Sequence, residues 1–149
     1  MRVLVVNAGS SSLKLRVVEE DDSVAGRLDL PAVGDLAPAQ LDAALADLGP
    51  VDAAGHRVVH GGPDLREPVV VDAAVRRRLD ELTDLAPLHQ PPSLAALDAL
   101  SRARPEVPAV ACFDTAFHAT LPAAAATYAV PTGWRRDLGV RRYGFHGLS

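Results

Sequence analysis

The turn from Asn7 to Lys14, which reads Asn-Ala-Gly-Ser-Ser-Ser-Leu-Lys, follows an apolar run and carries the groups best suited to an anion. Hydroxyls at Ser10, Ser11 and Ser12 and the backbone N–H groups of such a turn can converge on a phosphate. Lys14 is the only lysine of the chain, and its compact charge suits a phosphate oxygen. An ordinary hairpin turn with a surface lysine is the alternative on the turn alone.

A second candidate is the segment 55–62, Gly-His-Arg-Val-Val-His-Gly-Gly. Strand alternation places Arg57 with Val59 on one face and His56 with His60 on the other. An arginine beside a small apolar side chain suits a short carboxylate, because one group pairs the charge and the other contacts a methyl. A surface ion pair is the alternative. The histidines do not match the helical zinc motif, which also needs a glutamate that is missing here.

Two further segments combine charge with aromatic residues. Asp114 follows an apolar run and precedes a hydroxyl, so it can hold magnesium, orient a nucleophile or simply cap a turn. His146 lies between two glycines in Arg-Arg-Tyr-Gly-Phe-His-Gly, where it can donate to a phosphoryl oxygen or be a structural histidine. The common nucleotide-binding and protein-kinase motifs do not occur in the chain.

The elements that must position these residues follow from hydrophobic periodicity and from Gly, Pro and cap signals. Strands are expected at about 2–6, 13–18, 23–30, 53–60, 108–113 and 128–130. Helices are expected at 38–48, from a cap at Asp72 to Pro87, and from a cap at Ser93 to Pro105. Three strands, a helix, a strand, helices and a further strand predict an α/β domain with a mixed sheet, whose opening hairpin carries the serine turn.

Composition limits the class of protein. The chain has 149 residues, of which 48% are hydrophobic and 23% charged, as in a single globular domain. Aromatic residues make up 4% and the net charge is −4, which argues against a general nucleic-acid binder. Cys112 is the only cysteine, so an internal disulfide is excluded and a reducing compartment is favoured. No apolar run is long enough for a membrane helix, and a cytoplasmic protein is expected.

Taken in order, five motifs resemble the acetate kinase family: residues 7–14, 56–62, 86–92, 113–118 and 141–147. The resemblance implies a ribonuclease-H-like domain of the actin-like ATPase type, with a mixed sheet opened by a β-hairpin and flanked by helices. It also implies a phosphotransferase that makes acetyl phosphate and ADP from ATP and acetate, reversibly, with Mg²⁺ and by direct in-line attack of the carboxylate.

The resemblance assigns a role to each matching residue. Asn7 would lie near the metal, and Ser10, Ser12 and Lys14 would lie on the ATP phosphates. Arg57 would bind the substrate carboxylate, with Val59, Leu88 and Phe145 around its methyl group. Asp114 and His146 would be catalytic, together with Arg57, and His89 would support them.

The same resemblance marks what is different in this chain. Residues 1–149 match an N-terminal domain, whereas the family continues into a nucleotide-binding and dimerisation domain, so the chain alone is expected to be inactive and the complete protein a homodimer. The span from Lys14 to Arg57 is also shorter than expected. A propionate or butyrate kinase of the same family and a non-catalytic small-anion-binding module remain as alternatives.

Overall fold

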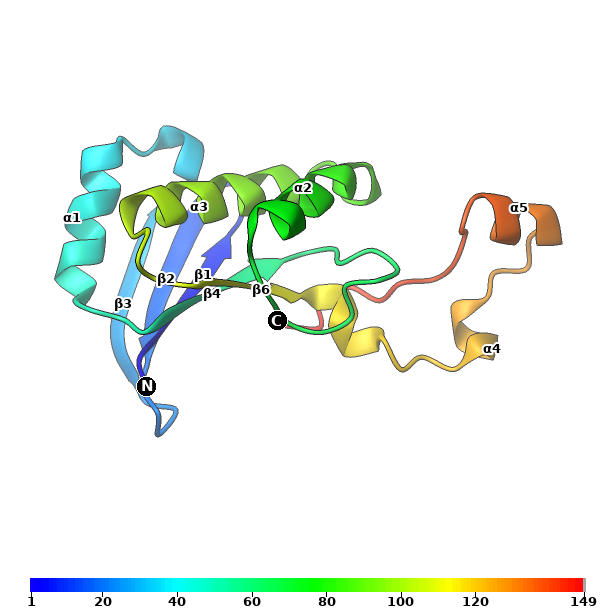
Figure 1. Ribbon diagram of the computed structural model, residues 1–149, viewed down its shortest axis with the longest axis horizontal. Helices are drawn as coiled ribbons and strands as arrows, with labels where there is room; N and C mark the ends of the chain where they lie inside the picture. The colour runs from blue at the N-terminus through cyan, green and yellow to red at the C-terminus, as the bar shows by residue number, and fades with distance from the viewer. Residues whose placement is uncertain (149) are drawn as a thin grey trace.

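The protein, described over residues 1–148 by a computed structural model, is built around one six-stranded sheet (Figure 1). The strands are β1 (Val3–Ala8), β2 (Ser12–Val18), β3 (Val24–Pro31), β4 (Ala53–Val58), β5 (Val69–Val70) and β6 (Ala109–Phe113). Their order across the sheet is β3-β2-β1-β4-β6-β5. Strands β1, β4 and β6 are parallel, while β2, β3 and β5 run antiparallel to their neighbours, which confirms the expected mixed sheet.

The opening hairpin follows from alternation in the sequence. Leu13, Leu15 and Val17 of β2 are completely buried, because alternate side chains of a strand point to the same face. The serine turn connects β1 to β2, and its Gly9 N–H donates to the carbonyl of Ser12 at 2.8 Å. The turn is therefore the loop of a hairpin, as expected, and lies at the carboxyl end of β1.

Three helices cover one face of the sheet (Figure 1): α1 (Pro38–Leu48), α2 (Ala73–Glu81) and α3 (Gln90–Ala103). Helix α3 packs on β1 and β4, and α1 and α2 both contact α3. Asp72 caps α2 by accepting from the N–H groups of Ala74 and Val75, as its side chain predicts. The shorter elements are η1 (Val33–Asp35), η2 (Thr83–Leu85), η3 (Asp114–His118), α4 (Ala123–Ala126) and α5 (Thr132–Asp137).

Four expectations for the elements are wrong. Helix α2 ends at Glu81, and the separate short turn η2 follows it before Pro87. Strand β4 ends at Val58, because the N–H and C=O groups of His60 bond to the side chain of Gln90 instead of a neighbouring strand. Helix α3 begins at Gln90 and not after Ser93, because prolines are tolerated in the first helical turn, where N–H groups lack partners anyway. Residues 128–130 form no strand, since the segment from α4 to α5 lies apart from the sheet (Figure 1).

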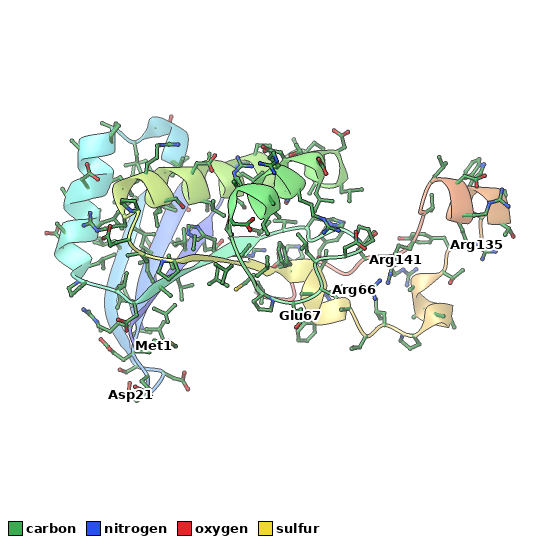
Figure 2. All side chains as sticks on the ribbon, in the orientation of Figure 1. Met1, Asp21, Arg66, Glu67, Arg135 and Arg141 are labelled. Carbon is green, nitrogen blue, oxygen red and sulfur yellow. The ribbon has the colours of Figure 1, made fainter. Side chains whose placement is uncertain are left out.

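The two ends of the sheet differ in character. Figure 2 places Met1 and Asp21 at one end, whereas Arg66, Glu67 and Arg141 lie toward the other, where the parallel strands finish. Beyond that end the chain makes an excursion through α4 and α5 and returns, with the Arg142 N–H donating to the carbonyl of Ala126 at 2.8 Å. None of the helices in residues 1–148 is long and apolar enough to cross a membrane.

Candidate active site

The candidate site begins where the three parallel strands end at the same edge of the sheet. Asn7 lies at the end of β1, Arg57 near the end of β4 and Asp114 directly after β6. Pairing of Val6 with His56 and of Arg57 with Cys112 brings these chain positions side by side. Because ligands of such sheets bind at the carboxyl ends of the strands, this edge is where the fold is suited to a site.

Arg57 is the centre of the arrangement. Its Nε donates to Asp114 Oδ1 at 3.0 Å and its Nη2 to Asp114 Oδ2 at 2.5 Å, and its Nη1 donates to Asn7 Oδ1 at 3.2 Å. Asp114 is 1% exposed, whereas Arg57 is 22% exposed. The carboxylate thus occupies one edge of the guanidinium and fixes its plane, while Nη1 retains a second N–H for another acceptor.

A cavity of about 500 Å³ opens over this pair. Ser10 of the serine turn, Arg57, Val59, His89, Asp114, Phe145 and His146 line it, as do Ala8, Gly9, Leu85, Ala86 and Pro92. Seven of the side chains singled out from the sequence therefore meet around one space, although they come from five separate segments. The lining combines a guanidinium, imidazole rings, a hydroxyl and small apolar groups, a combination suited to a small anion with an apolar end.

Four of the residues with an assigned role lie outside the cavity lining: Asn7, which bonds to Arg57 as described above, and Lys14, Ser12 and Leu88. Lys14 is exposed on β2 directly opposite Asn7, so it shares with Asn7 the sheet face next to Arg57. Ser12 is half-buried at the start of β2, and its carbonyl closes the serine turn. Leu88 is 78% exposed, and Leu85 and Ala86 of the preceding segment contribute the apolar lining instead.

The segment that carries His146 has an unusual backbone. His146 has φ 58°, a left-handed conformation that is costly for a residue with a Cβ atom and is often found at functional sites. Its neighbour Gly144 lies so close to the ring of His118 that a Cβ atom would clash, and Gly147 lies equally close to Phe117 and to the Asp114 carbonyl. Close packing therefore explains both glycines of this motif.

Some residues of the site were not identified from the sequence. Gln90 is completely buried, and its amide bonds to both backbone groups of His60. Thr115 accepts from the Gly61 N–H at 3.0 Å, which ties the end of β4 to the turn after Asp114. A polar side chain directly before two prolines was the one available signal for Gln90. Ala86 and Pro92 lie within the motif 86–92 but were given no role, and Leu85 lies outside every motif, because small apolar residues are common in loops.

Two histidines near Arg57 are buried: His56 on the opposite face of β4, as alternation predicts, and His60 just beyond the end of that strand. His56 is 1% exposed, its two ring nitrogens have no partner among the described residues, and burial lowers its pKa to about 4. Burial also lowers the pKa of His60, whose Nδ1 accepts from the Gly62 N–H at 2.8 Å. Both rings are therefore neutral near pH 7, and neither supplies positive charge to the cavity.

The residues at the edge allow a limited metal site. Within residues 1–148, histidine, cysteine and carboxylate side chains do not gather in groups of three or more. Asn7 Oδ1 and Asp114 Oδ2 both accept hydrogen bonds from the Arg57 guanidinium, so they lie close together. They offer one amide and one carboxylate ligand. Mg²⁺ is commonly held by one or two protein oxygens, with water and phosphate oxygens completing its octahedron, and the donor set fits that pattern.

A mixed sheet with polar and charged side chains at the carboxyl ends of its parallel strands fits an α/β domain of the actin-like ATPase class, and comparisons with known proteins agree. Residues 35–149 match the model of the acetokinase family. An acetate kinase from Arthrobacter sp. (strain FB24) is 43% identical over 173 positions, which include 100% of this chain and 44% of that protein. One from Thermotoga maritima is 38% identical, over 100% of this chain and 45% of its own length.

Solved structures agree with the sequence matches. A propionate kinase from Francisella tularensis superimposes with a TM-score of 0.86 at 29% identity, covering 99% of this chain and 46% of that one. Porphyromonas gingivalis acetate kinase gives 0.82 at 30% identity, with the same coverage. The chain belongs to the acetokinase family, and it spans a little under half the length of these relatives.

Proposed function

We propose that this chain supplies the carboxylate- and phosphate-binding part of a kinase that transfers a phosphoryl group between ATP and acetate. The observation that carries the proposal is the Arg57–Asp114 pair, which opens onto a cavity lined by Val59, Phe145 and His146. Relatives named acetate kinase support the choice of acetate as the substrate and of phosphoryl transfer as the reaction.

The reaction asks little covalent chemistry of the protein. A carboxylate is ionised at neutral pH and needs no base, so the barrier comes mainly from repulsion between two anions and from alignment. In the proposed mechanism Arg57 binds the acetate carboxylate through the N–H that Asp114 leaves free, and Val59 and Phe145 enclose the methyl group. An oxygen of acetate attacks the γ-phosphorus, the bond from that phosphorus to the bridging oxygen breaks, and ADP leaves with the electron pair.

Positive and polar groups would then stabilise the transferring phosphoryl group. His146 donates to one of its oxygens, while Lys14 and Ser10 approach from the hairpin side of the same edge. Asp114 keeps the plane of Arg57 fixed and orients the substrate. His89, at the cavity wall, supports this arrangement, and Ser12 shapes the turn. Leu88 is proposed as a methyl-pocket residue only if the segment around it moves inward, because its side chain is exposed.

Mg²⁺ would be held by Asn7 and Asp114 together with phosphate oxygens, and it would supply charge neutralisation for the nucleotide phosphates. ATP and ADP would contact this chain through their phosphates. We further propose that residues 1–149 act as the N-terminal domain of a longer, dimeric cytoplasmic kinase, since the relatives that match the whole chain are more than twice as long. The remaining nucleotide contacts would come from the second domain.

Propionate is a second candidate substrate. The Francisella tularensis neighbour is named a propionate kinase, and Val59, a mid-sized residue, lines the cavity together with Arg57. A pocket discriminates between acids that differ by one methylene by only about 1–3 kcal/mol, so both acids could react at different rates.

The test has two parts that use the 149-residue chain. Calorimetric titration with acetyl phosphate should give saturable binding in wild type and none in Arg57→Ala, and sulfate at equal ionic strength is the control ligand. An assay for acetyl phosphate formed from ATP, Mg²⁺ and acetate should show no significant turnover by the chain alone. Robust turnover would overturn the two-domain part of the proposal, and absence of binding in wild type would overturn the site.

A further inference from the structure

The segment Tyr143–Gly147 carries two cavity residues, Phe145 and His146, yet its backbone forms no strand or regular helix. No ladder of backbone hydrogen bonds therefore holds it beside Arg57. Side chains of other segments must do so, and the contacts of this segment show which ones they are.

The ring of His60 makes the central contacts. It meets the ring of Tyr143 edge to face, with centroids 4.5 Å apart and an angle of 64°, and that of Phe145 at 5.7 Å and 67°. His118 adds a contact from η3, with its Nε2 3.0 Å from the Phe145 carbonyl oxygen. Edge-to-face pairs at these separations are attractive beyond the area that they bury. His60 is thus the residue next to β4 on which the segment rests.

His60 is itself held in one position and one protonation state. Gln90 bonds to both of its backbone groups, at 3.3 Å from the N–H and 3.1 Å from the carbonyl. Its Nδ1 accepts from the Gly62 N–H, so the ring proton is on Nε2 and a second proton on Nδ1 would face that donor. A neutral, fixed ring offers a defined surface for aromatic edges.

We infer that His60 is a positioning residue, which seats the Tyr143–Gly147 segment so that Phe145 and His146 reach the cavity over the Arg57–Asp114 pair. Arg57 lies three residues before His60. One short stretch of chain therefore supplies the cavity arginine and also holds the segment that carries Phe145 and His146. The lowered pKa of His60 agrees with this role, because a neutral ring persists over the physiological pH range. The functional consequence rests on the function proposed above, while the seating itself does not.

His56 is the matched control for a test. It is a buried histidine within β4, four residues earlier, but it lines a small space beneath α1 and α3, away from the segment. The experiment compares His60→Leu with His56→Leu in the 149-residue chain. Backbone ¹⁵N relaxation of residues 143–147 measures seating, urea unfolding measures stability, and titration with acetyl phosphate measures the effect on the site.

We expect His60→Leu to lower the order parameters of residues 143–147 from about 0.85 to below about 0.6, whereas His56→Leu leaves them unchanged. Affinity for acetyl phosphate should fall by about tenfold in His60→Leu alone, because misplacement of binding groups is costly. His60→Phe keeps an aromatic ring at this position and should retain most of the order.

Equal order parameters in the two leucine variants would overturn the inference, as would a His60→Phe variant as loose as His60→Leu. Should His60→Leu not fold, Tyr143→Leu removes the same contact from the loop side and must loosen residues 143–147 to the same extent. If wild type does not bind acetyl phosphate, the proposed function fails, but the order parameters still decide whether His60 seats the segment.

Discussion

Two arginine–aspartate pairs of this protein have nearly the same geometry and very different surroundings. Arg57 binds Asp114 through Nε and Nη2, at 3.0 and 2.5 Å, and Arg76 binds Asp98 through the same atoms, at 2.7 and 2.8 Å. The arginines are equally exposed, at 22% and 23%, but Asp114 is 1% exposed and Asp98 35%. The first pair borders the cavity, whereas the second joins α2 to α3.

The difference shows that the form of an ion pair does not identify a functional site. Arg76 also pairs with Asp80 of its own helix, whose Oδ1 lies 2.7 Å from Nη1, and this nitrogen is buried and not open to a ligand. Arg57 has an amide oxygen as its third partner and keeps donor capacity toward the cavity. A functional arginine keeps N–H groups free to donate after its ion pair has formed, and a ligand can reach those groups.

The largest expected effect comes from removing each arginine in turn. Arg57→Ala should abolish acetyl phosphate binding and lower the free energy of unfolding by about 3–5 kcal/mol, because it leaves the buried Asp114 carboxylate without its partner. Arg76→Ala should cost about 1 kcal/mol, because water can solvate Asp98. Urea unfolding and calorimetric titration measure both effects. Equal losses of stability in the two variants, with binding retained in Arg57→Ala, would remove the distinction between the pairs.

The second-largest effect concerns how the free energy of unfolding depends on pH through His56, which lies on the sheet face that the helices cover. The pKa of His56 is about 4 in the folded protein against 6.5 in the unfolded chain, so as pH falls below 6.5 the unfolded state takes up a proton that the folded state does not. The free energy of unfolding should therefore fall by about 3 kcal/mol between pH 7 and pH 4. His56→Leu should remove this part of the pH dependence. Parallel stability curves for the two proteins would contradict it.

A smaller effect is expected for the lone lysine. Lys14→Ala should lower the affinity for acetyl phosphate by about tenfold, as for loss of one charged hydrogen bond, and change stability by less than about 0.5 kcal/mol. Arg27→Ala, an exposed cation of the adjacent β3, is the matched control and should leave affinity unchanged. Equal effects of the two variants would mean that Lys14 acts only through the general field of the surface.

The smallest effect concerns the apolar end of the cavity. Val59→Ala enlarges the space beside Arg57 by two methyl groups and should raise the affinity for propionate relative to acetate by about threefold to tenfold. NMR titration with the two acids gives the ratio. An unchanged ratio would place the apolar end of the ligand elsewhere, against Phe145 or Leu85.

Parts of the chain with a regular pattern were predictable from sequence. The alternation of Leu13, Leu15 and Val17 fixed the hairpin, and Asp72 marked the start of α2, because local chemistry alone decides both. Helix α3 was expected to begin four residues too late, after a cap at Ser93 instead of at Gln90. Its beginning depends on Gln90 binding a strand end that is distant in sequence.

The site shows the same difference between features set by local sequence and features set by distant contacts. Arg57, Asp114 and His146 were recognisable because their residue types and motifs are informative, and the structure brings them to one cavity. The direct pairing of Arg57 with Asp114 was not predicted, since it depends on which strands are neighbours. The exposure of Leu88 and the role of the His60 ring likewise arise from loop packing, for which the sequence offers no periodic signal.

The most direct test of the account follows the side-chain Nε–H signals of the two paired arginines by ¹H–¹⁵N NMR during titration with acetyl phosphate. Arg76 serves as the reference within the same molecule, and the Arg57→Ala spectrum assigns the Arg57 signal. We expect a saturable shift of the Arg57 signal and a constant Arg76 signal. Equal shifts of both signals, or none at Arg57, would contradict the claim that the Arg57–Asp114 pair binds the substrate.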